Sequence, residues 1–430
     1  MARLRAKIAP PPVPHALGYR MPAEWEPHEA TWLGWPHELT DWPGKFSPIP
    51  WAFAEIVRHL ARVEQVFLIV EDRVAEVRAK AMLEKAGAPT ELVRFFHVPT
   101  DRGWMRDSGP IAVRATQSSD RHSERNARTS HLRPGEAGTS GHAVEESLLG
   151  VSALPESVVE ERSFDSVPRG ADNSPIPEAR DFAQDDKHGA VTLLNFVFNG
   201  WAKYSDHKRD TRVVALANRK LRRPLLLPEH KKQRVVLEGG SIDVNGRGTL
   251  ITTEECLLST VQARNPGFTK LDYAQVFKKY FGVTNVLWLR NGIAGDDTHG
   301  HIDDLARFVD PHTVVTVVEE DHSETNYAPL QENLALLREM KDQDGQPLRV
   351  ETLPMPRPVY FAGQRLPASY ANFYIANKLV LVPTFNDPAD RVALNTLASV
   401  FPDREIVPIY CRDLVLGLGT IHCMTQQLPW

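Results

Sequence analysis

Four short polar stretches of the chain carry residue types that can do chemistry. Cys423 stands near the end, in IHCMTQQLP, and His301 and Asp303 stand close together in GDDTHGHIDDLARF. Asp107 lies in DRGWMRDSGP, and Glu238 precedes two glycines in LEGGSIDVNG. A glycine pair permits close approach of the backbone to another group. A thiol, an imidazole and several carboxylates are therefore available, provided that the fold brings these distant stretches together.

Each stretch taken alone has a simpler explanation. A free cysteine is most often a small buried residue, and the charges of DRGWMRDSGP suit a solvated loop equally well. The spacing of His301 and Asp303 predicts that both lie on one face of a strand. The histidines and aspartates of residues 296–304 could bind a metal ion, but the chain has no HExxH or CxxC motif to support one. We therefore expect no metal site there.

The four stretches together suit attack of a thiolate on a guanidinium carbon. That carbon is planar, resonance-stabilised and a poor electrophile, so the attack needs three kinds of help. Two carboxylates can each accept a pair of N–H bonds and hold the positive charge in place. The bound cation and a nearby imidazolium can lower the pKa of the thiol, which generates the thiolate nucleophile. A histidine can give a proton to departing ammonia and later take one from water.

Composition favours a globular protein that acts on a small molecule. Of the 430 residues, 42% are hydrophobic and 24% are charged, and the formal net charge is −5. This balance indicates no nucleic-acid surface and slightly favours a cationic substrate. The three cysteines are too few for a disulfide framework, which indicates a reducing compartment. No segment resembles a signal peptide or approaches the ~18 apolar residues of a membrane span. We expect a cytoplasmic protein that binds neither nucleic acid nor membrane.

Helical and extended patterns alternate along the chain, which predicts repeated α/β units. Helices followed by strands are expected over 51–65 and 66–70, 73–87 and 93–99, 271–282 and 285–289, 326–345 and 348–355, and 388–402 and 405–410. Two hairpins are expected, one over 235–253 with an Asn-Gly turn and one over 373–383. No repeat of individual residues accompanies the units. The polar stretches fall at the ends of apolar runs.

Residues 116–189 differ from the rest of the chain. The segment is polar, has few aromatic residues and shows no sustained periodicity, so it cannot bury enough surface to offset its ordering entropy. We predict a disordered insertion in a single catalytic domain over 21–430, which a flexible tail over 1–20 precedes. The flanks, 110–115 and 190–198, have the patterns of strands. If they pair as antiparallel neighbours, the ends of the insertion lie close together.

Six stretches carry a resemblance to a known family: MPAEWEPHEATWLGWP, DRGWMRDSGP, LEGGSIDVNGRGTLITT, GDDTHGHIDDLARF, SYANFYIANKLVLVPTFND and IHCMTQQLP. Together they resemble the agmatine deiminases, of the peptidylarginine-deiminase-like branch of the guanidine-modifying (pentein) superfamily. The resemblance implies an α/β fold, a five-fold pseudosymmetric propeller with its active site on the central axis. It also implies hydrolysis of agmatine to N-carbamoylputrescine and ammonia through a covalent amidino-cysteine, a step toward putrescine that needs no cofactor or metal.

The resemblance also assigns roles to the five residues introduced above. It implies that Cys423 is the nucleophile and that His301 is the acid and base. Glu238 would bind a substrate nitrogen or orient His301, and Asp107 and Asp303 would hold the guanidinium. The chain departs from the family in its insertion and at Leu418, where the run GLG has leucine in place of a usual glycine.

Three further residues are implied to bind the rest of the substrate. Trp104 would pack on its apolar stem, Asp297 would hold the far amine of agmatine, and Asn372 matches a pocket position. The other two thiols, Cys256 and Cys411, are predicted to be core residues.

Other functions remain open at the level of sequence. Deimination of free arginine or of peptidyl-arginine uses the same core, but an arginine carboxylate would need a cation where Asp297 stands. A non-catalytic guanidine-binding scaffold is an alternative of another class. The expected partner is a small cationic guanidine, and a homo-oligomer is compatible with the sequence.

Overall fold

Five sheets repeat one connection pattern in this computed structural model, which describes residues 14–116 and 191–430. In each of these sheets, two parallel strands are joined through a helix, and a third strand pairs antiparallel with the first of the two. All of the described residues belong to one compact unit. The fold is therefore mixed α/β, as the alternating sequence pattern predicted.

The strands of the five sheets, in spatial order, are β21 (Thr425–Pro429), β2 (His28–Gly34), β3 (Gln65–Val70) and β4 (Val93–His97); β1 (Tyr19–Arg20), β5 (Ile111–Ala115), β6 (Val191–Leu194) and β7 (Leu225–Leu226); β10 (Asp243–Val244), β11 (Thr249–Thr253) and β12 (Asn285–Leu289); β13 (Ala306–Phe308), β14 (Thr313–Val318) and β15 (Arg349–Pro354); and β18 (Tyr374–Ile375), β19 (Leu379–Thr384) and β20 (Glu405–Tyr410). Two short hairpins complete the strands: β8 (Glu229–His230) with β9 (Gln233–Arg234), and β16 (Val359–Phe361) with β17 (Gln364–Leu366).

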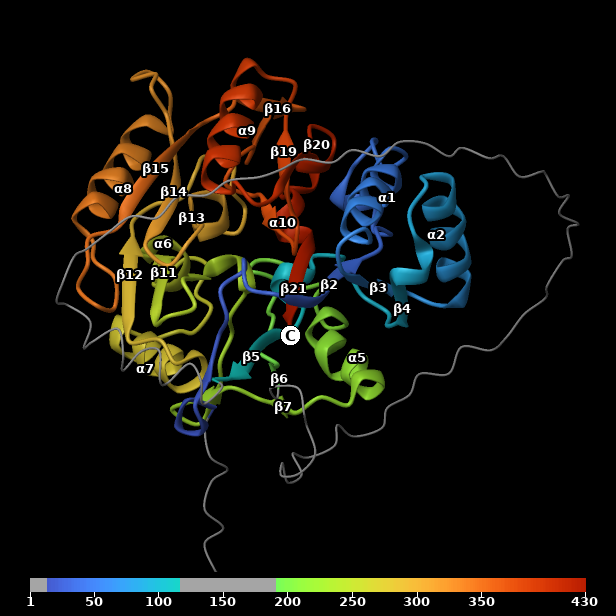
Figure 1. Cartoon of the computed structure of the whole chain (residues 1–430), viewed down its shortest axis with the longest axis horizontal. Coiled ribbons are helices and arrows are strands. Elements are labelled where there is room, and N and C mark those ends of the chain that lie inside the picture. The colour runs from blue at the N-terminus through green and yellow to red at the C-terminus, as the bar shows by residue number, and fades with distance from the viewer. Residues whose placement is uncertain (1–13, 117–190) are drawn as a thin grey trace, which may run out of the picture. The chain divides into compact units, whose positions relative to one another are not determined.

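The helices that cross between parallel strands are α1 (Ile49–Leu60), α2 (Arg73–Lys85), α5 (Val213–Leu221), α7 (Lys270–Phe281), α8 (Tyr327–Glu339) and α9 (Pro388–Val400). Three helices of one turn, α3 (Met105–Ser108), α6 (Glu254–Leu257) and α10 (Ile421–Met424), lie at the ends of strands. In Figure 1, α7, α8 and α9 lie toward the outside of this unit, whereas α10 and β21 lie near its middle.

Sequence patterning accounts for the helices and the core that they cover. The predicted apolar face of α1, with Phe53, Ile56, Val57 and Leu60, is buried. Burial of each such side chain stabilises the fold by roughly 1.5–3 kcal/mol. Helix α7 begins at a capping box and ends at Gly282, whose φ of 73° suits the left-handed conformation that ends many helices.

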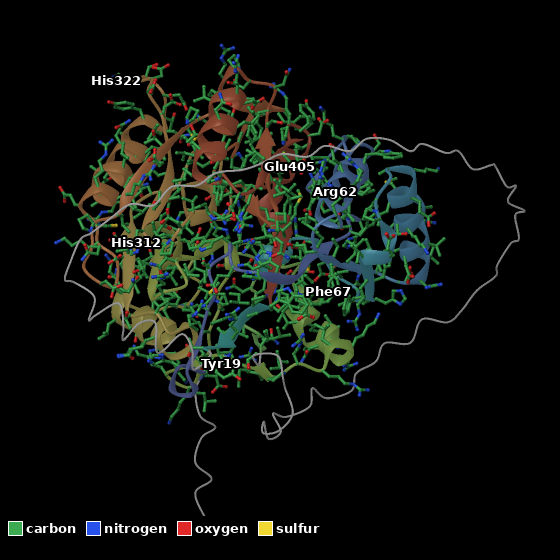
Figure 2. All side chains as sticks on the ribbon, in the orientation of Figure 1. Tyr19, Arg62, Phe67, His312, His322 and Glu405 are labelled. Atoms are coloured by element: carbon green, nitrogen blue, oxygen red, sulfur yellow. The ribbon has the colours of Figure 1, made fainter. Side chains whose placement is uncertain are left out.

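Contacts between first and last elements close the unit. Strand β21 pairs with β2, so the final residues lie beside the first long strand. Arg62, just after α1, donates from Nη2 to Oε2 of Glu405 at the start of β20, at 2.8 Å (Figure 2). Elements from the beginning and the end of the described chain are thereby joined to each other.

Two local predictions near the polar stretches are wrong. Residues 301–304 form a turn of 3-10 helix over Ile302–Asp304 rather than a strand that carries His301 and Asp303 on one face. The apolar run before Glu238 forms one isolated bridge, between Val197 and Val236, instead of a strand. In both places the chain turns where side chains converge, and tertiary contacts override the local pattern.

A sixth helix–strand pair escaped the sequence analysis. Helix α5 and strand β7 follow β6, but β7 has only two residues in the ladder. The sequence feature that indicated this helix was the apolar pattern of Val213, Val214 and Ala217, which are the buried positions of α5. So short a strand is too weak a pattern to detect by periodicity.

The predicted flanks of the insertion pair as expected. Strands β5 and β6 are antiparallel neighbours, with Ile111 opposite Leu194 and Arg114 opposite Val191. The predicted insertion itself, apart from Thr116, lies outside the described residues. Of the predicted tail over 1–20, residues 1–13 lie outside the described residues, and Tyr19 and Arg20 pair with β5 as β1. No helix among the described residues is both long enough and apolar enough to cross a bilayer.

Candidate active site

The four polar stretches meet at turns that directly precede strands. The short helices α3 and α10 contact each other, and the turn over Gly239–Ser241 contacts both α3 and the turn over Ile302–Asp304. Each turn ends or begins a strand of a different sheet. Residues separated by hundreds of positions are thereby placed side by side.

Cys423 lies buried on α10, at the start of β21. The amide Nδ2 of Asn372 donates to its Sγ at 3.1 Å, and Sγ is 3.6 Å from Oδ2 of Asp303. The side-chain Oδ1 of Asn372 accepts the backbone N–H of His422 at 3.0 Å. Asn372, a predicted pocket residue, thus touches the thiol and also fixes the turn that presents it.

Gly419 and Leu418, which precede Cys423 in the chain, shape its surroundings. A methyl group on Gly419 would lie 2.9 Å from Cβ of Cys423 and 3.0 Å from Cζ3 of Trp104, so only glycine fits between them. Gly419 therefore lies between the Trp104 ring and Cys423. Leu418 has a φ of 68°. This left-handed conformation costs about 1–2 kcal/mol for a non-glycine residue, which explains why glycine suits that position better.

His301 is surrounded by three carboxylates. Its Nδ1 lies 3.9 Å from Oδ1 of Asp107 and 3.9 Å from Oδ1 of Asp303, and its Nε2 lies 3.9 Å from Oε2 of Glu238. Among the described residues, neither ring nitrogen has a hydrogen-bond partner, and neither does Oε2 of Glu238 or Oδ1 of Asp303. Buried polar atoms are rarely left without partners in a native protein. A ligand with several N–H groups would satisfy them.

Gly240 keeps space open between these groups. A methyl group there would lie 2.5 Å from Nδ1 of His301, 3.0 Å from Oδ1 of Asp107 and 3.1 Å from Oδ2 of Asp303. The glycine pair after Glu238 therefore does permit close approach, and the backbone N–H of Gly240 donates to Asp107 at 3.2 Å.

The three carboxylates differ in charge. Burial would raise the pKa of Glu238, but Arg264, whose Nε donates to it at 3.0 Å, and His301 lower that pKa to about 2. Burial raises the pKa of Asp107 to about 6, against the pull of His301. Burial would also raise the pKa of Asp303, but the hydrogen bond from His422 lowers it. Glu238 and Asp303 are thus firmly ionised, and Asp107 titrates near neutrality.

The thiol and the imidazole hold their protons in the free site. Burial and the carboxylates of Asp303 and Asp304 raise the pKa of Cys423 well above its usual value. Burial would lower the pKa of His301, but Asp107 and Glu238 raise it well above its usual value. The lowered pKa that we expected for the thiol therefore requires a bound cation, because the empty site is rich in negative charge.

A buried ion network behind the thiol was missed by sequence reasoning. The ring of His422 lies between two carboxylates, with Nδ1 2.7 Å from Asp303 and Nε2 2.9 Å from Glu24. Glu24 also accepts from Arg106 at 3.0 Å and from Arg307 at 2.8 Å. The signals were present, since Glu24 lies in MPAEWEP and His422 adjoins Cys423, but neither spacing indicates a contact.

Asp297 lies apart from the five residues above and is already paired. The ammonium of Lys203 contacts its Oδ1, and the hydroxyl of Tyr204 donates to its Oδ2 at 2.5 Å. The loop just before Lys203 contains three consecutive residues in the left-handed conformation, with φ of 66° at Gly200, 56° at Trp201 and 55° at Ala202. Such strain is typical of functional loops.

The strained loop also contacts Asp107. Nε1 of Trp201 donates to Oδ2 of Asp107 at 2.8 Å. The loop thus links Asp107 to the Lys203 and Asp297 pair, which the sequence analysis did not foresee.

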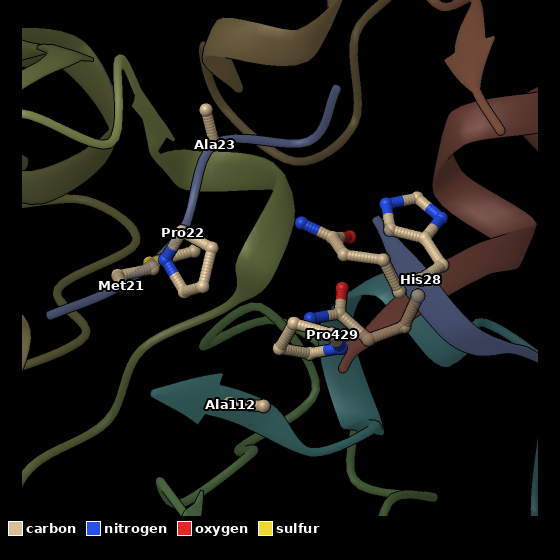
Figure 3. A pocket seen from close by; sticks show the side chains of 8 residues that line it. Met21, Pro22, Ala23, His28, Ala112 and Pro429 are labelled. Carbon is tan, nitrogen blue, oxygen red and sulfur yellow. The ribbon is translucent and has the colours of Figure 1, made fainter. Parts of the chain in front are cut away.

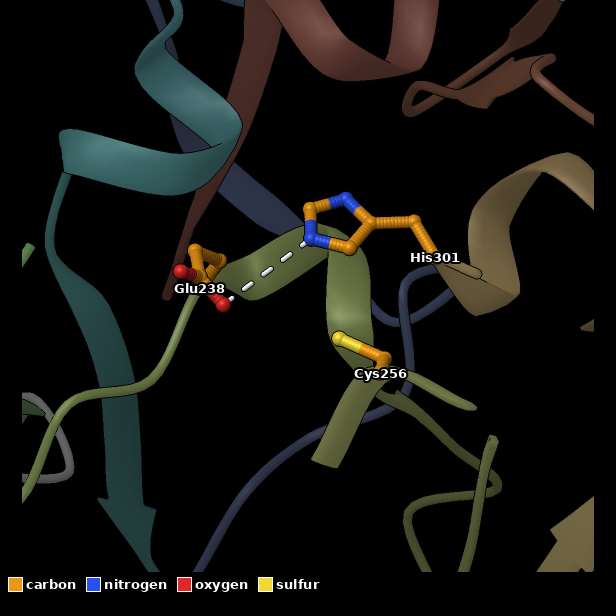
Figure 4. Close-up of side chains that lie close together, drawn as sticks. All are labelled: Glu238, Cys256 and His301. Atoms are coloured by element: carbon orange, nitrogen blue, oxygen red, sulfur yellow. Dashed lines mark ion pairs between the residues drawn. The ribbon is translucent and has the colours of Figure 1, made fainter. Parts of the chain in front are cut away.

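Cys256 is a buried core thiol, as predicted, but it also has polar neighbours that the sequence did not indicate. One ligand atom from each of Glu238, Cys256 and His301 lies within 4.8 Å of the others, and all three residues are buried (Figure 4). Cys256 reaches this place from α6, whereas Cys411 lies buried in the apolar core as predicted.

A small pocket elsewhere holds none of the predicted site residues. It is lined by Met21, Pro22, Ala23, His28, Ala112, Gln426, Gln427 and Pro429 (Figure 3). Its lining offers no nucleophile and no cluster of carboxylates, so the polar cluster around Cys423 is the better candidate for catalysis.

The chain belongs to the Porphyromonas-type peptidyl-arginine deiminase family, whose sequence model matches residues 20–130 and 172–429. It is 31% identical to the agmatine deiminase of Pseudomonas aeruginosa strain UCBPP-PA14 over 443 aligned residues, which cover 98% of each chain. A protein of Latilactobacillus sakei that carries the name agmatine deiminase is 30% identical to this chain. The alignment covers 97% of each chain.

Solved structures give the same grouping. The agmatine deiminase of Enterococcus faecalis superposes with a TM-score of 0.74 at 26% identity, over 97% of this chain and 98% of the other. A cysteine-to-serine variant of the C. jejuni agmatine deiminase with substrate bound superposes with a TM-score of 0.70 at 25% identity, over 95% and 96% of the two chains.

Proposed function

We propose that the chain hydrolyses agmatine to N-carbamoylputrescine and ammonia, as an agmatine deiminase in putrescine formation. The observation that carries this proposal is the set of buried acceptors without partners, Oε2 of Glu238 and Oδ1 of Asp303, around the space that Gly240 leaves. A guanidinium offers the planar array of N–H donors and the positive charge that such a site requires. The agmatine deiminases to which the chain is similar support the choice of agmatine.

In the first step, the guanidinium binds between Asp107, Asp303 and Glu238. Its charge offsets theirs and so lowers the pKa of the nearby Cys423 thiol. The Cys423 thiol loses its proton to solvent, and the thiolate attacks the guanidinium carbon and forms a tetrahedral intermediate. His301, which carries a proton in the free site, donates it to the departing nitrogen. Ammonia leaves, and the amidino group stays bound to sulfur.

In the second step, water replaces the thiol. His301, now neutral, takes a proton from water as the oxygen attacks the amidino carbon. The bond from carbon to sulfur breaks, Cys423 departs as a thiolate that takes up the hydroxyl proton of the intermediate, and N-carbamoylputrescine is released. Asp303 and Asn372 hold the sulfur in place throughout, because both contact it in the free site. The chemistry needs no metal or cofactor.

The far amine of agmatine is proposed to bind at Asp297, with Trp104 along the apolar stem. Lys203 complicates this assignment, because its ammonium already contacts the Asp297 carboxylate. Lys203 is also the cation that a substrate with a carboxylate at this end would need. Deimination of free arginine or of peptidyl-arginine therefore stays as the second candidate function.

The wider predictions from the sequence remain proposals. The five sheets with one connection pattern support a five-fold pseudosymmetric propeller with the active site on its axis. We propose a single catalytic domain over 21–430 that the insertion interrupts, and a cytoplasmic location. The proposed partner is a small cationic guanidine, with neither nucleic acid nor membrane, and a homo-oligomer is compatible with the fold.

A side-by-side assay tests the function. The purified chain is given agmatine, free arginine and a blocked arginyl peptide at equal concentrations, and the ureido product is measured. The proposal predicts the highest kcat/KM for agmatine. A higher kcat/KM for arginine or for the peptide would move the assignment to the second candidate, and no product from any of them would support a non-catalytic scaffold.

A further inference from the structure

One buried thiol beside the candidate catalytic histidine has no part in the proposed reaction. Cys256 lies on α6 and is fully buried. Its backbone N–H donates to the side chain of Thr253 at 3.0 Å, which fixes the turn. The sulfur lies near one ring nitrogen of His301 and one carboxylate oxygen of Glu238, all within 4.8 Å of one another (Figure 4).

These three side chains offer the donor set that zinc prefers. Thiolate, imidazole and carboxylate are its usual protein ligands, and three of them with a water molecule complete a tetrahedral site. Two of the donors have no competing bond: within residues 14–116 and 191–430, Oε2 of Glu238 and both nitrogens of His301 lack hydrogen-bond partners. Arg264 donates from Nε to Oε1 of Glu238 at 3.0 Å, which leaves Oε2 available to bind an ion.

The nucleophilic cysteine is a poorer place for the same ion. The imidazole next to Cys423 in sequence, His422, is engaged at both nitrogens, by Asp303 at 2.7 Å and by Glu24 at 2.9 Å. The thiol itself is bonded to the Asn372 amide. A metal ion there would have to break hydrogen bonds of a kind that neither ring nitrogen of His301 makes among the described residues.

We propose that Glu238, Cys256 and His301 form an inhibitory binding site for Zn²⁺. An ion bound there occupies His301, the proposed acid and base, and Glu238, a proposed substrate contact, so metal and guanidine exclude each other. The ion is not needed for catalysis. The binding follows from the three side chains alone, whereas the inhibition rests on the proposed function.

Binding is tested with Co²⁺, which gives an absorption band when a thiolate binds it. The background is Cys423→Ser, so that the nucleophile cannot supply the sulfur. We expect a thiolate band at one Co²⁺ per chain in this variant and in Cys423→Ser with Cys411→Ser, a matched buried thiol. The band should vanish in Cys423→Ser with Cys256→Ser, and also with Cys256→Ala. A band that survives loss of Cys256, or its absence in the Cys423→Ser background, overturns the proposal.

Inhibition is tested by titrating agmatine turnover with Zn²⁺ in chelator-treated buffer. Loss of a residue that only hydrogen-bonds to a metal ligand weakens the binding of the metal by about 10- to 100-fold. Loss of a direct ligand in Cys256→Ser should therefore raise the half-inhibitory Zn²⁺ concentration at least about tenfold, and Cys411→Ser should match the parent. Equal inhibition of all three proteins overturns the inhibitory role. If the chain turns over no agmatine, the proposed function fails while the Co²⁺ result still decides the site.

Discussion

The imidazole Nδ1 of His422 lies 2.7 Å from Oδ2 of Asp303, the same oxygen that lies 3.6 Å from the Cys423 sulfur. On its other side, Nε2 of His422 lies 2.9 Å from Glu24. Each ring nitrogen of His422 therefore faces a carboxylate oxygen. His422 is thereby a positioning residue that holds Asp303 against the thiol.

His422→Ala should lower kcat by about 100-fold, the usual effect of a small misplacement of catalytic groups. It should also lower the free energy of unfolding by about 1–3 kcal/mol, because Glu24 and Asp303 lose a buried partner. His422→Gln retains an amide donor for Asp303 and should recover part of kcat. Steady-state kinetics and thermal melts separate the two effects. An unchanged kcat in a destabilised His422→Ala variant would show that the contact is only structural.

Gly240→Ala should abolish turnover by filling the space at the centre of the site. The added methyl group would lie 2.5 Å from Nδ1 of His301. We expect kcat/KM to fall at least about 100-fold through displacement of His301 and Asp107. Gly103→Ala is the matched control, since its methyl group would meet nothing closer than 3.4 Å. A Gly240→Ala variant with the parent's kcat/KM would contradict the placement of the guanidinium.

Lys203→Met should shift preference further toward agmatine. The Lys203 ammonium shares the Asp297 carboxylate with the proposed amine site, and an exposed pair of this kind is worth about 0.2–1 kcal/mol. Its removal should lower KM for agmatine by up to about fivefold and raise KM for free arginine. Asp297→Asn should raise KM for agmatine while kcat changes little. If Lys203→Met raises KM for agmatine, the lysine supports the amine site rather than competing for it.

Much of this site could be predicted from the sequence, and the rest could not for identifiable reasons. Cys423, His301 and Glu238 stand in distinctive local patterns at the ends of apolar runs. The polar neighbours of the core residue Cys256 were missed because they come from distant turns. His422 was overlooked for the same reason, since its partner Glu24 lies at the other end of the chain. Local patterns find the elements, whereas convergence of turns is a property of the whole fold.

Replacement of residues 117–188 by a short turn should leave catalysis intact. The antiparallel pair β5 and β6 already holds the flanking residues together. Shortening about 70 residues to about 5 is nearly four doublings of loop length, which favours folding by about 2 kcal/mol through loop-closure entropy. Thermal melts and agmatine kinetics should show a Tm no lower than the parent's and an unchanged KM. A tenfold rise in KM at equal stability would place the segment in the pocket.

The most direct test of the account is to trap the covalent intermediate. Parent enzyme in steady-state turnover of agmatine is quenched in acid, digested and analysed by mass spectrometry. The account predicts an amidino adduct on the peptide that carries Cys423, retained in Cys256→Ser and Cys411→Ser and absent from a folded but inactive Cys423→Ser. An adduct on the peptide of Cys256 or Cys411, or turnover by Cys423→Ser at the parent's rate, would contradict it.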